Sequence, residues 1–206
     1  MNGLREALTR ELPGHAGFLE MSGWRTAAIE EARQRDGSPR ESAVMMLLHP
    51  AGTTLRTTLI VRPQYDGVHS GQVAFPGGRR EAEDVDLWTT AVREMGEEVG
   101  VGPEGLQMLG PLSTVYIPPS RSLVTPFVGY LGSVPIYTPD VREVAEVFEV
   151  STEELLEPSV LGRTRRYLPV IGSDASVPCF NLHGHEVWGA TAMMLWELRE
   201  LLFRLR

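Results

Sequence analysis

Residues 77–101 constrain the fold and the chemistry of this chain more than any other segment. Their sequence is GGRREAEDVDLWTTAVREMGEEVGV, and its second part predicts a helix over residues 87–99. Residues three and four apart share one face of a helix, so Glu94, Glu97 and Glu98 are expected to project together within one turn. Clustered carboxylates repel one another, and something must therefore offset their charge.

A divalent cation is the partner that this cluster predicts. Mg²⁺ and Mn²⁺ prefer oxygen ligands, and Mg²⁺ commonly sits between carboxylates and substrate phosphates. Arg93 can pair with a neighbouring carboxylate and hold the cluster in shape. Gly77 and Gly78 let the backbone approach a ligand without an intervening side chain. An isolated Glu-x-x-Glu-Glu is typical of a solvated acidic helix, but the ordered strand end, glycine pair, charged loop and helix favour a site.

The same residues resemble the Nudix box of the Nudix hydrolases, a family that cleaves nucleoside diphosphates linked to another moiety. The second half of the box is matched by Arg93, Glu94, Met95, Glu97, Glu98, Gly100 and Val101. At the general spacing of the box, Arg79 and Val85 fall where a glycine and a glutamate belong. One inserted residue restores Gly78 and Asp84 to those places.

The longer spacing is similar to that of the coenzyme A pyrophosphatase branch of this family. The branch carries an upstream signature that ends in Phe-Pro-Gly-Gly. The chain matches this signature at Arg62, Gly71, Phe75, Pro76, Gly77 and Gly78. It lacks the signature threonine, has Pro63 in place of a small polar residue, and has Gly67 where the second arginine belongs. The resemblance covers roughly residues 42–205.

The order of the predicted elements and the resemblance imply one architecture. The chain is expected to be α+β, with the Nudix fold as an α/β/α sandwich around a mixed β-sheet. Residues 1–40 are predicted to form an N-terminal helical arm, and residues 41–206 the Nudix hydrolase domain. Helices are predicted at residues 4–12, 24–34, 87–99, 151–156 and 190–205, and strands at 42–49, 54–62, 73–75, 106–114, 123–131 and 144–150. The first two strands are predicted to pair as a hairpin, and residues 158–181 to be irregular.

The resemblance implies metal-assisted hydrolysis of a pyrophosphate linkage, with Mg²⁺ or Mn²⁺ as the cofactor. The implied metal ligands are Glu94 and Glu98, then Glu97, with a backbone carbonyl near Gly78. The implied catalytic residues are Arg93 and Glu97, with Glu143 and Glu146 as candidates for the general base. The residues implied in substrate binding are Arg62, His69, Gly77 and Gly78.

The implied substrate is coenzyme A or an acyl derivative, cleaved to 4′-phosphopantetheine and adenosine 3′,5′-bisphosphate. Arg62 is the first candidate for contact with the 3′-phosphate, and the basic cluster of residues 163–166 is the second. Two alternatives stay open: hydrolysis of another nucleoside diphosphate derivative such as ADP-ribose, and a Nudix-fold ligand-binding module without catalysis. The intact glutamate cluster argues against the module, because a binding domain has no need of it.

The composition limits the partners of the chain. Lys and Arg number 19 against 27 Asp and Glu, a net charge of -8, and an acidic surface repels nucleic-acid phosphates. No window approaches about 18 uninterrupted apolar residues, so a membrane span is not predicted. The one cysteine, Cys179, excludes an intrachain disulfide and fits a reducing cytoplasm. The expected partner is therefore a small nucleoside diphosphate, with no nucleic acid and no membrane, and a homodimer is left open.

Overall fold

The computed structural model describes residues 2–22, 33–34, 37–66, 70–168 and 172–206. The main sheet contains β1 (Arg40–Ala51), β2 (Thr54–Val61), β3 (Val73–Ala74), β4 (Gly77–Arg79), β5 (Leu106–Pro111), β6 (Val115–Ile117), β7 (Ser122–Leu131) and β8 (Glu146–Ser151). A smaller sheet contains β9 (Leu161–Leu168), β10 (Ser173–Leu182) and β11 (His185–Trp188). The helices are α1 (Asn2–Leu8), α2 (Ala16–Ser22), α4 (Leu87–Val99), α5 (Thr152–Leu156) and α6 (Gly189–Phe203). None of the described helices combines the length and the hydropathy that crossing a membrane requires.

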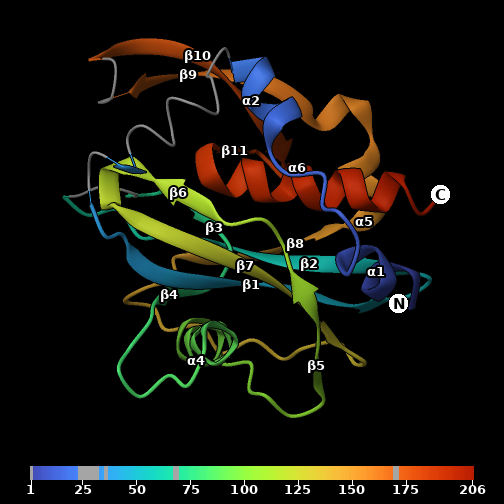
Figure 1. The fold of residues 1–206 in the computed structure, drawn as a ribbon. Helices are drawn as coiled ribbons and strands as arrows, with labels where there is room; N and C mark the ends of the chain where they lie inside the picture. The colour runs from blue at the N-terminus through green and yellow to red at the C-terminus, as the bar shows by residue number, and fades with distance from the viewer. Residues whose placement is uncertain (1, 23–32, 35–36, 67–69, 169–171) are drawn as a thin grey trace.

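The main sheet lies between two helical layers. Its principal path runs β3-β2-β1-β7-β5, and β4, β6 and β8 pair with β1, β7 and β2 respectively. Strands β1 and β7 run parallel at the centre, and the other pairs of this sheet are antiparallel. Helix α4 covers one face of the sheet, and α6 covers the opposite face (Figure 1). The predicted α+β sandwich with a mixed sheet is confirmed.

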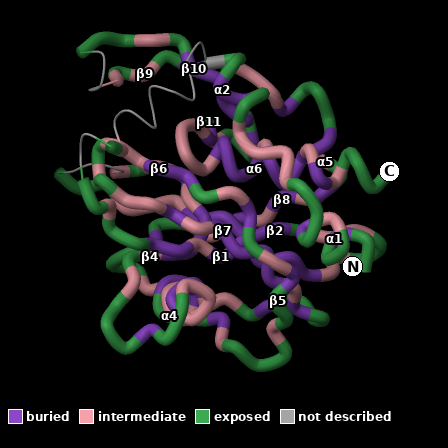
Figure 2. Tube along the Cα trace, in the orientation of Figure 1, coloured by how far each residue is buried: buried purple, intermediate pink, exposed green. Residues whose placement is uncertain are grey.

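Strand β1 is buried on both faces and divides the core in two. Met45 and Leu47 pack in the cluster that includes α4, whereas Met46 and Leu48 pack in the cluster that includes α6. Successive side chains of a strand point to opposite faces, so a central strand needs an unbroken apolar run. Figure 2 shows the resulting band of buried residues along the central strands. The predicted hairpin of β1 and β2 is confirmed by their antiparallel pairing.

Helix α4 has the predicted bounds because its end signals are local. The Asp86 carboxylate accepts a hydrogen bond from the Thr89 N–H at 2.8 Å, as an N-cap side chain does. Gly100 follows the helix in the left-handed conformation, with φ of 73°. A Cβ on Gly100 would also lie 2.8 Å from Thr138 Cβ. Both the conformation and the close contact therefore require glycine.

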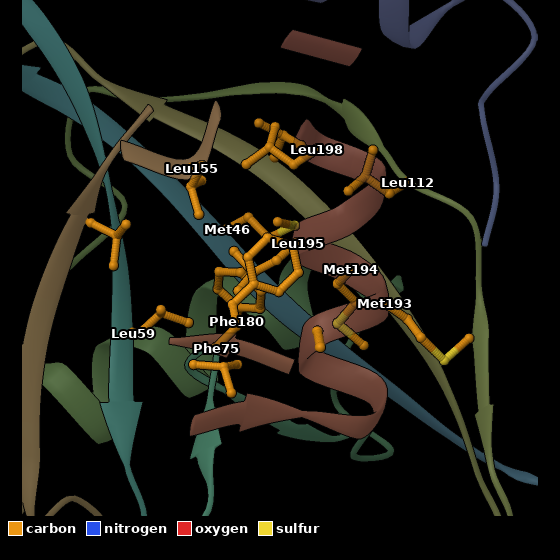
Figure 3. Close-up of a cluster of buried hydrophobic side chains, with 14 of the residues drawn as sticks. Met46, Leu59, Phe75, Leu112, Leu155, Phe180, Met193, Met194, Leu195 and Leu198 are labelled. Atoms are coloured by element: carbon orange, nitrogen blue, oxygen red, sulfur yellow. The ribbon is translucent and has the colours of Figure 1, made fainter. Parts of the chain in front are cut away.

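Helix α6 fills the larger core between the two sheets. Leu195 and Leu198 of α6 belong to one buried cluster with Met46 of β1 and Phe180 of β10 (Figure 3). The helix predicted over residues 190–205 is confirmed by α6, in which these two leucines are buried, whereas Leu205 lies beyond the helix and is exposed. The helix thus holds the smaller sheet against the main one.

The prediction that residues 158–181 are irregular is wrong. Strands β9 and β10 pair antiparallel, with Arg163 opposite Pro178, and β11 pairs with the end of β10. The sequence of β9, LGRTRRYL, is rich in arginine and lacks a clear apolar alternation. Its extended conformation depends on pairing with β10, and such pairing dominates strand formation when local propensity is weak.

Two other differences concern short strands, and one predicted helix is not tested. The strand predicted over residues 106–114 ends at Pro111, and β6 begins at Val115 as a separate strand on β7. Strand β4 is not among the predicted strands, because its glycines have low strand propensity. The helix predicted over residues 24–34 lies almost entirely outside the described residues.

A buried carboxylate fastens the N-terminal segment to α6. Glu197 accepts hydrogen bonds from the Gly14 and Ser113 N–H groups, both at 2.9 Å. His15 Nε2 lies 3.4 Å from the same carboxylate. Burial alone would raise the pKa of Glu197, but the nearby His15 ring and the hydrogen bonds from Ser113 outweigh it and hold the pKa below its usual value. The segment before β1 is thus held on the body, and the division at residue 40 stays a prediction.

Glu197→Gln is expected to lower the free energy of unfolding by about 2–4 kcal/mol at pH 7. The NH₂ group of the new side chain would face backbone N–H donors that need an acceptor. Urea denaturation measures the change, and Glu20→Gln, at an exposed position, is the control expected within about 0.5 kcal/mol of wild type. The folded-state pKa of Glu197 is below the unfolded value of 4.5, so the difference should persist above that pH and shrink as pH falls through the folded pKa. Equal stability at pH 7 would contradict this role.

Candidate active site

Glu98 brings a buried carboxylate to the glycine pair Gly77–Gly78. It lies in the last turn of α4, and 2% of its side chain is exposed. Its Oε2 accepts a hydrogen bond from the Gly77 N–H at 2.7 Å, and its Oε1 lies 3.5 Å from Arg62 Nη2. Burial raises the pKa of Glu98 to about 7, against the opposing effects of Arg62 and the Gly77 N–H. The protein groups around Glu98 therefore offset its charge only in part.

Glu94 occupies the space that the missing side chain of Gly78 leaves. A Cβ built on Gly78 would lie 2.4 Å from the Glu94 carboxyl group, which is closer than nonbonded atoms approach. Burial is the main cause that raises the pKa of Glu94, and Arg93 opposes it. Glu94 and Glu98 lie one helical turn apart. Both carboxylates therefore reach the glycine pair.

Arg93 is held in a fixed position by Asp84. The two carboxylate oxygens of Asp84 accept hydrogen bonds from Arg93 Nε at 3.1 Å and from Nη2 at 3.0 Å. Asp84 is buried and also accepts from Thr90 Oγ1 and from the Glu81 N–H, both at 2.9 Å. Hydrogen bonds with Arg93 hold the pKa of Asp84 well below its usual value. This two-point contact, between residues nine apart, fixes the guanidinium plane.

The free side of the Arg93 guanidinium orders two of the predicted site glutamates. Its Nη1 donates to Glu94 Oε1 at 3.0 Å and to Glu97 Oε2 at 2.8 Å. The Glu97 side chain is 58% exposed, against 14% for Glu94. Glu97 therefore lies at the solvent edge of the cluster, whereas Glu94 and Glu98 lie inside it.

Glu143 is close enough to both inner carboxylates to affect their charge. Its negative charge contributes to the raised pKa values of Glu94 and Glu98. The segment that carries Glu143 is fixed to α4, because the Asp140 N–H donates to the Glu98 carbonyl at 3.0 Å. Glu143 itself is exposed, so it has access to solvent beside the buried glutamates.

The other predicted site residues are placed differently. Glu146 begins β8 and is 52% exposed, with His185 Nε2 at 3.4 Å from its carboxylate. Arg62 donates from Nη2 to the Gly77 carbonyl at 3.2 Å, next to the peptide that holds Glu98. His69 lies outside the described residues. The structure therefore brings Arg62, but not Glu146, into direct contact with the glycine pair.

A cavity of about 650 Å³ opens beside the glycine pair. Its walls come from β1, β4, the segment after β6, the start of α6, and the helix α2. Arg40, Arg62 and Arg79 take part in the lining. Small-molecule sites commonly have volumes of about 300–1,000 Å³. The cavity is therefore large enough for a nucleotide-sized ligand.

The carboxylates at Gly78 suit a hard divalent cation. Among the described residues, no three His, Cys, Asp or Glu side chains form a ready-made metal site. The Glu94 charge nevertheless raises the pKa of Glu98, so a cation between them would relieve repulsion. Carboxylate and carbonyl oxygens are the ligands that Mg²⁺ and Mn²⁺ prefer. The donor set thus fits such an ion.

The sandwich fold, the glycine pair and the glutamates on α4 together define a Nudix hydrolase. A family model for the NUDIX domain matches residues 39–170. The chain belongs to this family, which confirms the resemblance seen in the sequence.

Three named proteins are similar in sequence to this chain. The Nudix hydrolase NudL of Pectobacterium atrosepticum is 35% identical over 167 residues, which cover 77% of this chain and 81% of the relative. The mitochondrial coenzyme A diphosphatase NUDT8 of Mus musculus is 35% identical over 144 residues, covering 68% of this chain and 65% of the relative. The peroxisomal coenzyme A diphosphatase NUDT7 of Mus musculus is 34% identical, covering 69% and 59%. The match therefore spans less than two thirds of each mouse protein.

Solved structures share the fold at low sequence identity. The Nudix hydrolase RenU from M. smegmatis matches with a TM-score of 0.55 and 18% identity, covering 82% of this chain and 88% of that one. The MutT protein from Methanosarcina mazei Go1 matches with a TM-score of 0.51 and 18% identity, covering 82% and 98%. These likenesses show the fold alone.

Gly78→Ala is expected to displace the Glu94 carboxyl group, which a Cβ would approach to 2.4 Å. Hydrolytic activity should fall about 100-fold, because small misplacements of catalytic groups are costly. The free energy of unfolding should change by less than about 1 kcal/mol, because the end of a glutamate side chain can move. Activity assays and urea denaturation measure the two effects.

Gly96→Ala, in helix α4, is the matched control for Gly78→Ala. Its Cβ would meet only the Val101 carbonyl, at 3.8 Å. This variant should keep its activity and gain about 0.5–1 kcal/mol of stability, because alanine is the better helix former. Full activity of Gly78→Ala would show that the space at the glycine pair is not needed.

Proposed function

We propose that this Nudix hydrolase cleaves the pyrophosphate bond of coenzyme A or of an acyl derivative. Addition of water across this bond gives adenosine 3′,5′-bisphosphate and 4′-phosphopantetheine or its acylated form. One observation carries the proposal: the buried Glu98 carboxylate meets the backbone of the glycine pair at the edge of a nucleotide-sized cavity. The two mouse relatives named as coenzyme A diphosphatases, 35% and 34% identical to this chain, support the choice of substrate.

The α4 glutamates would hold the cofactor, Mg²⁺ or Mn²⁺. Glu94 and Glu98 are the first ligands, with Glu97 and the Gly78 carbonyl as further oxygen donors. When bound there, such a cation would supply Lewis-acid polarisation of the diphosphate and would lower the pKa of an attacking water. Arg93 keeps Glu94 and Glu97 in place through its contact with each carboxylate.

Two residues near the glycine pair would act on the diphosphate and on the water. Arg62 lies against the Gly77 carbonyl, where its positive charge would bind a diphosphate oxygen. Glu143 is favoured over Glu146 as the general base, because its charge acts on the buried glutamates while Glu146 lies beside His185. A base must come within hydrogen-bond reach of the water it deprotonates.

The proposed location is the cytoplasm. Cys179 is a free and buried thiol, and burial raises its pKa, which makes it unreactive. A single inert thiol is typical of proteins that keep no disulfides.

Hydrolysis of a substrate panel by the purified enzyme with millimolar Mg²⁺ or Mn²⁺ tests the proposal. We expect kcat/KM for coenzyme A to exceed that for ADP-ribose and for dinucleotides by about tenfold or more, a difference of about 1.4 kcal/mol. Glu98→Gln should lower kcat on the order of 10³-fold, because a metal ligand loses its charge. Glu83→Gln, at an exposed position of the charged loop before α4, should retain wild-type activity.

Each alternative gives a different result in this panel. A wild type that prefers ADP-ribose would favour hydrolysis of another nucleoside diphosphate. Binding of these compounds without hydrolysis would favour a binding module. Near-normal turnover by Glu98→Gln would remove Glu98 from the metal site.

Millimolar Mg²⁺ or Mn²⁺ is expected to raise the melting temperature of the wild type. A ligand that binds only the native state adds RT ln(1 + [L]/Kd), about 2.7 kcal/mol at a concentration of 100 Kd. Relief of repulsion between Glu94 and Glu98 acts in the same direction. Thermal melts with and without the ion measure the shift, and Glu98→Gln should lose most of it. An equal shift in both proteins would place the ion elsewhere.

A further inference from the structure

Strand β4 separates two spaces of different chemistry. Gly78 faces α4, because a Cβ on it would meet Glu94. Successive residues of a strand point to opposite faces, so Arg79 faces the cavity, whose lining it joins. Ser42 pairs with Arg79 across β1 and β4, and Arg40 lies two residues earlier on the same face of β1. Arg40 and Arg79 therefore lie at the same end of the cavity.

The guanidinium groups of Arg40 and Arg79 have no partner in the described part of the chain. Neither side chain makes a hydrogen bond or an ion pair with any described residue. Both line the cavity, in a protein whose net charge is -8. Two neighbouring cations without carboxylates to neutralise them repel each other, and they provide a local positive field for an anion.

The arginines predicted from the sequence to contact the 3′-phosphate already contact acceptor groups within the protein. Arg62 lies against the Glu98 carboxylate and the Gly77 carbonyl. Arg163 donates to the Ser176 carbonyl at 2.7 Å, and Arg166 donates to Glu186 at 2.7 Å. An arginine that already satisfies protein acceptors gains less from a phosphate than one that does not.

We propose that Arg40 and Arg79 bind a phosphomonoester of the substrate, separate from the diphosphate that is cleaved. The inference rests on the function proposed above, and in coenzyme A this group is the 3′-phosphate. A guanidinium fork matches phosphate geometry, and a phosphomonoester dianion matches two positive charges. The cleaved diphosphate would lie on the α4 side of β4, and the phosphomonoester on the cavity side.

The rest of the cavity explains why the second phosphate would bind at this end. Its lining beyond the arginines includes aromatic and aliphatic side chains such as Tyr116, Ile117 and Trp188. Transfer of a phosphate dianion to such surroundings is costly, whereas an adenine ring or an acyl chain is well suited to them. The two arginines thus fix the orientation of the nucleotide in the cavity.

Titration calorimetry without divalent cations tests this subsite independently of hydrolysis. The probes are adenosine 3′,5′-bisphosphate and adenosine 5′-monophosphate, which differ by one phosphomonoester. The wild type should bind the bisphosphate about tenfold more tightly or better, and Arg40→Gln and Arg79→Gln should each lose most of this preference. Arg10→Gln, on a side chain that is 71% exposed, should keep it. Thermal melts confirm that all variants are folded.

The turnover assay gives a second readout. For Arg40→Gln and Arg79→Gln, KM for coenzyme A should rise about tenfold, while KM for 3′-dephospho-coenzyme A stays within about twofold of wild type. The subsite would be overturned if the wild type showed no preference for the bisphosphate. It would also be overturned if the variants lost affinity equally for the compounds with and without the phosphomonoester. Loss of the preference only in Arg165→Gln, in the cluster of residues 163–166, would overturn it as well. Preference for the bisphosphate without cleavage of coenzyme A would support the subsite and refute the proposed function.

Discussion

The hydrogen bond from the Gly77 N–H to the buried Glu98 carboxylate is the contact on which the rest of the site depends. It joins β4 to the last turn of α4 at 2.7 Å. Strand β4 is in turn fixed to the central strand, where Val44 pairs with Gly77. The segment with the candidate base meets the same helical turn, because the Asp140 N–H donates to the Glu98 carbonyl. A shift of α4 along the sheet would therefore leave a buried carboxylate without its donor, which costs several kcal/mol.

Two kinds of charge interaction lie side by side in this segment. The contact between Asp84 and Arg93 is matched, since two oxygens accept from two N–H groups. Glu98 is not matched, because its pKa is raised to about 7 although Arg62 lies 3.5 Å away. The paired Asp84 and Arg93 fix the positions of the neighbouring groups, and the incompletely paired Glu98 carboxylate keeps a charge that a cation can stabilise. A site needs both, because an unneutralised group binds selectively only when its surroundings hold it still.

Features with local signals could be predicted from the sequence, and features that depend on distant partners could not. The ends of α4 follow from a capping carboxylate and from Gly100, so its bounds are predicted correctly. The β9–β10 pair has no such signal, since its arginine-rich strand is extended only because it pairs. The role of Asp84 as the partner of Arg93 likewise appears only when the loop folds back on the helix. The arginines at 40 and 79, which have no side-chain partner among the residues that the structure describes, are harder still, because a missing neighbour cannot be seen in the sequence.

The alternation of strand β4 explains how one short segment can serve two tasks. Gly78 points toward the α4 carboxylates and must lack a side chain, because a Cβ would overlap Glu94. The next residue, Arg79, points the other way, into the cavity. A slip of one residue in the pairing of β4 with β1 would exchange the two directions, so that an arginine would enter the carboxylate cluster and a glycine would face the cavity. The register Val44 to Gly77, secured by the Glu98 hydrogen bond, therefore specifies both the side proposed to bind the metal and the side proposed to bind the anion.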